Sequence, residues 1–143
     1  MLTVQKLLLL RRADLFADMS TRELGHVARI AREAVYSAGS TIFDEGDYGD
    51  SLFIIASGEV AVTRGGRPIG VLREADYFGE MAVLTGETRS ATIKASSDCL
   101  LLRIEQPEFH QILAGNFDAV LAVIRTLCRR LRPADSQRGT DSG

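Results

Sequence analysis

The stretch FGEMAVLTGETRSAT, residues 78–92, decides the interpretation of this 143-residue chain. Gly79 lets the backbone approach a ligand closely, and residues 80–84 have the pattern of one helical turn whose free N–H groups would point at one spot. Arg89 then begins a strand with Ser90 beside it, so a guanidinium and a hydroxyl join those N–H groups around an anion such as phosphate. Glu80 suits a neighbouring sugar, because carboxylates accept hydrogen bonds from ribose hydroxyls. The stretch predicts a site for a phosphate joined to a ribose.

Around this stretch, the sequence consists of short β-prone runs separated by turn residues. The runs lie at residues 41–43, 52–56, 60–63, 90–95 and 99–104. Gly65-Gly66 suits a two-residue turn with positive φ, so residues 60–72 form a hairpin in outline. Many short strands with tight turns favour a sandwich or barrel. We therefore predict a mainly β fold, an antiparallel double-stranded β-roll of the jelly-roll type, over residues 35–104.

Helices flank the predicted roll. Residues 1–34 have helical spacing, and Ser20 with Glu23 forms a capping box at the start of the second helix. Residues 107–132 are helical again, with apolar side chains recurring every three or four positions from Phe117. Residues 133–143 contain almost no apolar side chains, which predicts a disordered tail. The chain is thus predicted to hold one domain over residues 1–132.

Composition excludes several classes of protein. There are 17 basic and 19 acidic side chains, so the net charge of −2 gives no basic excess for nucleic-acid binding. The apolar run Leu7–Leu10 is too short for a membrane span or a signal peptide. Two cysteines and two histidines, without a metal-ligand spacing or a nucleophile motif, predict no metal site and no catalysis. Few cysteines also suit reduced thiols in the cytoplasm.

Two motifs in this order resemble those of one known family. Residues 78–92 look like the phosphate-binding cassette of the cyclic nucleotide-binding domain family, and residues 46–60, GDYGDSLFIIASGEV, are similar to its glycine-marked β-roll signature. The family includes regulatory subunits of cyclic-nucleotide-dependent kinases, the bacterial catabolite activator and cyclic-nucleotide-gated channels. The resemblance covers about Leu15 to Arg132 and implies the same β-roll, with the C-terminal helices acting as a lid.

The resemblance also implies a role for individual residues. Glu80 would bind the ribose 2′-hydroxyl, and Arg89 would pair with the cyclic phosphate. Backbone N–H groups that would complete the phosphate site belong to Gly79, Ala82, Ser90 and Ala91. Residues that would line the pocket around the sugar and base are Val62, Ile69, Gly70 and Phe78. Candidates for capping the base are Leu127, Arg130 and Leu131.

The implied function is a regulatory module for signal transduction. Its ligand would be cAMP rather than cGMP, with no further cofactor, and binding would be transmitted through the C-terminal helix. The partner would be an effector domain in a larger protein or a second copy held through that helix, in the cytoplasm or on the cytoplasmic face of a membrane protein.

Three alternatives belong to other classes. The first is a β-roll interaction domain that no longer binds nucleotide. The second is a cupin-type enzyme, which is disfavoured because neither histidine lies on a predicted strand. The third is a DNA-binding regulator, which is disfavoured by the charge and because residues 133–143 cannot supply a DNA-binding domain.

Overall fold

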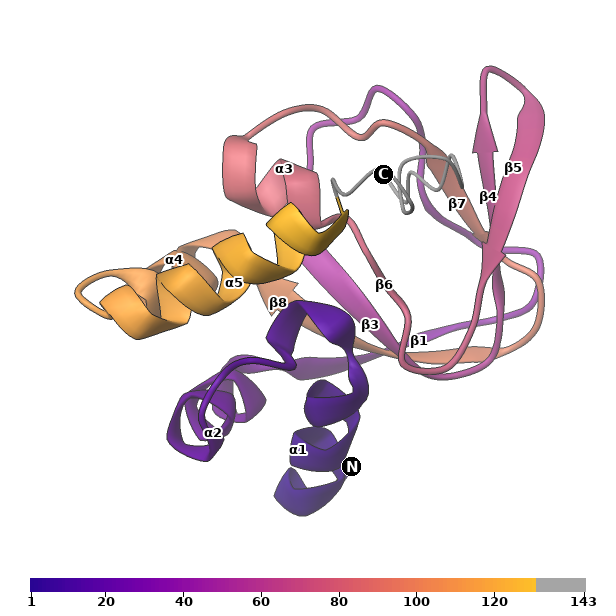
Figure 1. Ribbon diagram of the computed structural model, residues 1–143. Helices are drawn as coiled ribbons and strands as arrows, with labels where there is room; N and C mark the ends of the chain where they lie inside the picture. Colours follow the sequence, from indigo (N-terminus) through magenta and orange to yellow (C-terminus); the bar gives the residue numbers. More distant parts are fainter. Residues whose placement is uncertain (131–143) are drawn as a thin grey trace.

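A computed structural model describes residues 1–130, and within them two antiparallel sheets form a roll with helices gathered along one side (Figure 1). The helices are α1 (Thr3–Arg12), the 3-10 turn η1 (Asp14–Phe16), α2 (Thr21–Ile30), α3 (Glu80–Thr85), α4 (Gln106–Leu113) and α5 (Phe117–Arg130). The strands are β1 (Arg32–Tyr36), β2 (Thr41–Phe43), β3 (Ser51–Ser57), β4 (Val60–Arg64), β5 (Arg67–Leu72), β6 (Tyr77–Phe78), β7 (Thr92–Ala95) and β8 (Cys99–Glu105).

Each sheet has four strands, in the orders β1-β8-β3-β6 and β2-β7-β4-β5. Their facing sides enclose an apolar cluster in which Phe53 stacks on Phe78 at a centroid distance of 5.2 Å, with Phe43 beside both rings. The predicted hairpin is present as β4 and β5, which pair from Val60↔Leu72 to Arg64↔Arg67. The mainly β, antiparallel β-roll predicted from the sequence is confirmed.

A second core lies between the helices and the outer side of the first sheet. Leu52 and Ile54 of β3 point into it, opposite the side on which Phe53 enters the roll. Phe16 and Phe109 are fully buried there and meet edge to face at 6.0 Å. The helical layer is therefore attached to β3 and β8, the two central strands of this sheet.

The helical part of the chain ends earlier than the predicted residue 34. Helix α2 stops at Ile30, and β1 pairs with β8 from Arg32↔Arg103 to Tyr36↔Cys99. Ala31 continues the helical spacing but is the junction between α2 and β1. Val35 and Tyr36, a β-branched and an aromatic residue, pair with β8, which the local periodicity of the sequence could not reveal. Two other boundaries differ from the prediction by one or two residues. Strand β7 begins at Thr92 rather than at residue 90, and α4 begins at Gln106 rather than at residue 107. The predicted helix end at Arg132 and the tail at 133–143 lie outside the described residues.

The predicted capping box starts α2. The Glu23 backbone N–H donates to Ser20 Oγ at 3.1 Å, and the Ser20 N–H donates to Glu23 Oε1 at 2.9 Å. This pairing explains why Glu23 is buried although it is charged.

In the part of the chain that the structure describes, no single helix has the length and apolarity needed to cross a membrane. The pair Gln106–Leu113 and Phe117–Arg129, bent by 113°, meets those two criteria only when taken together.

Candidate ligand-binding site

Arg89 lies inside the molecule, with 5% of its surface exposed. Its Nη1 donates to the Gly79 carbonyl at 3.3 Å, and its Cζ lies 4.0 Å from the centre of the Phe43 ring. A guanidinium over an aromatic face is held by the ring's quadrupole. Its Nε is buried and has no hydrogen-bond partner within residues 1–130. A buried donor of this kind normally binds something, so the guanidinium is suited to receive a ligand.

Two glycines make room for this guanidinium. A Cβ atom added to Gly49 would collide with the Nε and Cζ atoms of Arg89. Gly79 has φ +84°, and its added Cβ would lie 2.6 Å from Arg89 Nη1 and 2.9 Å from the Ser51 carbonyl oxygen. Side chains rarely adopt such a φ, so Gly79 is required both by its conformation and by the space.

Glu80 follows Gly79 as the first residue of α3 and is 2% exposed. Burial lowers the pKa of Arg89, while the negative charges of Asp50, Asp47 and Glu80 oppose that effect. An arginine guanidinium stays protonated in proteins despite such a shift. The structure therefore brings together the two charged side chains, Glu80 and Arg89, that the sequence singled out.

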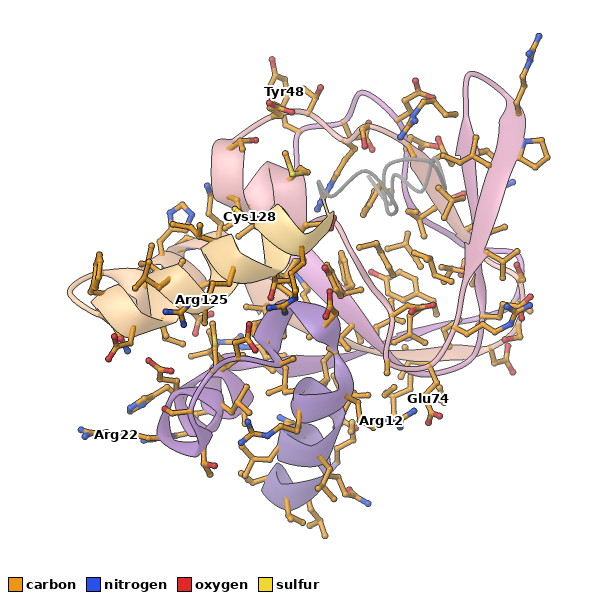
Figure 2. All side chains as sticks on the ribbon, in the orientation of Figure 1. Arg12, Arg22, Tyr48, Glu74, Arg125 and Cys128 are labelled. Carbon is orange, nitrogen blue, oxygen red and sulfur yellow. The ribbon has the colours of Figure 1, made fainter. Side chains whose placement is uncertain are left out.

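The loop between β2 and β3 holds the chain at Arg89. Gly46 N–H donates to the Arg89 carbonyl, and Arg89 N–H donates to the Asp47 carbonyl, each at 2.8 Å. Tyr48 extends outward from this loop and is 89% exposed (Figure 2). Among the described residues, no group of three or more histidine, cysteine, aspartate or glutamate side chains could hold a metal ion.

The other predicted site residues fall into two groups. The buried ones are Val62, Phe78 and Ala91 in the cluster inside the roll, Gly79 beside Arg89, and Ala82 on α3. Those exposed to solvent are Ser90, Ile69 and Gly70. Ile69 and Gly70 belong to the edge strand β5, where Gly70 pairs with Val62 of the inner cluster, so their contact with a sugar or base stays a prediction. Phe43 and Gly49 also contact or border the guanidinium, and neither was predicted from the sequence, although Gly49 lies within the 46–60 motif.

Helix α5 packs on the 3-10 turn η1 and the residues that follow it. Arg129 Nη1 donates to Asp18 Oδ2 at 2.7 Å, which raises the pKa of Arg129, and the buried Thr126 hydroxyl donates to the Asp14 carbonyl at 3.3 Å. Leu127, one of the predicted base-capping candidates, packs against the helical core. The side chain of Arg130 and all of Leu131 lie outside the described residues.

A cavity of about 460 Å³ lies between α2 and α4, away from Arg89. Its lining residues are His26, Arg29, Ile30, Glu108, Gln111, Ile112 and Asn116. It contains none of the predicted ligand-binding residues, so it does not define the site.

Comparison with known proteins identifies the family. The cyclic nucleotide-binding domain model matches residues 33–116, more than half of the chain. The chain therefore belongs to the cyclic nucleotide-binding domain family, whose domains are generally regulatory rather than catalytic.

Two relatives and one solved structure illustrate its range. The chain is 28% identical over 135 residues to a cAMP-dependent protein kinase regulatory subunit of Schizosaccharomyces pombe, covering 94% of this chain and 32% of that protein. It is 32% identical over 117 residues to a cyclic nucleotide-gated potassium channel of Rhizobium etli, covering 82% and 32%. The regulatory domain of Toxoplasma gondii PKA, crystallised with cAMP, superposes with a TM-score of 0.73 at 31% identity, covering 77% of this chain and 44% of that one. The chain thus spans about a third of the length of these two curated relatives.

Proposed function

We propose that this chain is a sensor domain that binds cAMP in preference to cGMP, with Arg89 on the cyclic phosphate and Glu80 on the ribose 2′-hydroxyl. The observation that carries the proposal is the burial of a guanidinium and a carboxylate together at the start of α3. The buried Nε donor of Arg89 and the carboxylate oxygens of Glu80 offer one hydrogen-bond donor and one acceptor group at the same place, which suits a ligand that carries both a phosphate and hydroxyls.

The remaining predicted residues keep secondary roles in this proposal. Backbone N–H groups of Gly79, Ala82, Ser90 and Ala91 complete the phosphate site, while Val62 and Phe78 contact the sugar and base from inside the roll. The preference for cAMP follows the kinase regulatory subunits and the PKA domain, whereas other relatives are cGMP-dependent protein kinases, so the comparison of cAMP with cGMP in the experiment below decides it.

Ligand binding is then transmitted through α4 and α5 to an effector. A ligand can shift these helices only by binding one of their positions more tightly than the other. Because the chain matches about a third of a kinase regulatory subunit and of a channel, the effector is a further part of a larger protein or a separate chain. A place in the cytoplasm, or on the cytoplasmic face of a membrane protein, suits such a sensor.

A thermal-shift panel with cAMP, cGMP and linear AMP tests the proposal. A ligand at 100 times its dissociation constant adds about 2.7 kcal/mol to the free energy of unfolding, so cAMP should raise the melting temperature most. Preference for linear AMP would contradict the cyclic-nucleotide assignment. No shift with any of the three would favour the alternative, a β-roll interaction domain without a ligand.

A second copy of the chain is the other partner that α5 suggests. Phe117, Ile124 and Cys128 are exposed along one side of the helix at coiled-coil spacing, while Ala119 and Val123 are buried on the other. Figure 2 labels Cys128 near the end of the described helix. We expect sedimentation equilibrium to detect a dimer that Ile124→Asp converts to a monomer. A monomeric wild-type chain at all accessible concentrations would contradict this partner.

A further inference from the structure

The C-terminal carbonyls of α3 need partners from outside the helix. α3 has only the residues Glu80–Thr85, and the Gly86 N–H closes it by donating to the Ala82 carbonyl at 2.9 Å. The next carbonyl, that of Val83, would need the N–H of residue 87, but Glu87 N–H donates to Thr85 Oγ1 instead. Carbonyls in the last turn of a helix must be satisfied by other groups.

Two side chains of α4 converge on this one carbonyl. His110 Nε2 lies 2.7 Å from the Val83 oxygen, and Gln106 Nε2 donates to the same oxygen at 3.2 Å. Because a carbonyl only accepts hydrogen bonds, His110 carries its proton on Nε2. The side chain of Val83 is fully buried in the helical core, so we expect the Val83 carbonyl to move together with α3 and not independently of it.

We infer that Gln106 and His110 form a polar tether through which a displacement of α3 is passed to α4 and α5. The inference rests on the proposed function, because α3 begins with the ligand-binding Glu80. Gln106 starts α4, and His110 lies one turn further along it, so both ends of the first turn are held to the same acceptor. The two are positioning residues, since neither is placed at the ligand.

Cys128 provides a way to observe this coupling. It is exposed on α5, whereas Cys99 is buried, so a thiol-reactive environment-sensitive fluorophore labels Cys128 selectively. Because Cys128 also lies on the face of α5 suggested for a second copy, all variants are made in the Ile124→Asp background, so that the emission does not report association. The experiment titrates cAMP into the labelled chain and records two quantities separately, the affinity by calorimetry and the ligand-induced change in emission.

The double variant Gln106→Leu/His110→Leu removes both donors. We expect its affinity for cAMP to stay within about threefold of the wild type, the scale of one net hydrogen bond, while its emission change falls by at least half. The single variant His110→Gln keeps an N–H donor at position 110 and should show most of the wild-type emission change. A general loss of stability would not distinguish it from the donor-free variant in this way. Gln111→Leu is the matched control on α4, because Gln111 makes no hydrogen bond to α3 within residues 1–130. The single variants replace the double one if it does not fold.

The outcomes separate the tether from the proposed function. If the wild-type chain binds cAMP and the donor-free variants show the same emission change, the tether is overturned while the sensor remains. An absence of any emission change in a wild type that binds cAMP also overturns it. If the wild type binds no cyclic nucleotide, the proposed function fails and the tether falls with it.

Discussion

Arg89→Leu should abolish most of the affinity for cyclic nucleotide. The guanidinium is a buried cation at this place, and a charge-assisted hydrogen bond contributes about 1.5–3 kcal/mol. Loss of even one such bond corresponds to at least about a tenfold rise in the dissociation constant, since about 1.4 kcal/mol is tenfold. Isothermal titration calorimetry with cAMP measures the effect directly.

The controls for Arg89→Leu separate the site from general charge effects. Arg67→Leu removes an exposed arginine on the edge strand β5 and should leave the dissociation constant unchanged. Glu80→Gln should weaken cAMP less than Arg89→Leu and should reduce the discrimination between cAMP and 2′-deoxy-cAMP. Unchanged affinity in folded Arg89→Leu would refute the assignment of Arg89 to the phosphate.

Gly49→Ala should weaken binding through a residue that is not itself placed on the ligand. Its new Cβ collides with Nε and Cζ of the buried Arg89, so the guanidinium cannot keep its position. The guanidinium is therefore displaced from the Phe43 ring and from the Gly79 carbonyl. A misplaced charge at the site should raise the dissociation constant about tenfold or more, the scale of one charge-assisted hydrogen bond.

Gly25→Ala is the matched control for this substitution. Gly25 lies within α2, and a Cβ there would meet nothing within 4 Å. Alanine is favoured over glycine in a helix interior by about 1 kcal/mol, so Gly25→Ala should raise the denaturation midpoint and leave affinity unchanged. If Gly49→Ala binds as tightly as wild type, the close packing of Gly49 against Arg89 does not govern the position of the guanidinium.

The local features of the fold followed from local sequence. Ser20 and Glu23 start α2 as their spacing predicted, and Gly65-Gly66 joins β4 to β5. Strand β1 could not be recognised in the same way, because an edge strand of five residues is defined by its pairing with β8 and not by its own periodicity. Residues far apart in sequence decide such elements.

The residues of the candidate site also divide into those that local sequence predicted and those that only the folded chain reveals. Glu80 and Arg89 were identified because their chemistry is unusual within a glycine-marked segment. Phe43 was not, because an aromatic residue in a short strand has the pattern of ordinary core, and only folding places its ring beneath Arg89. Ile69 and Gly70 were assigned by a looser alignment along β5, and the structure leaves them exposed.

The junction between β8 and α4 has a mechanical consequence. Helix α4 starts at the residue after the strand ends, and the Gln106 N–H is fixed to the Asp50 carbonyl at 2.6 Å. Because the first residue of α4 is fixed in this way, we expect any movement of α4 to be a tilt about Gln106 rather than a slide along the helix axis. Asp50 lies in the same loop as Gly46 and Asp47, which hold the backbone of Arg89, so the start of α4 and the chain at Arg89 share one support.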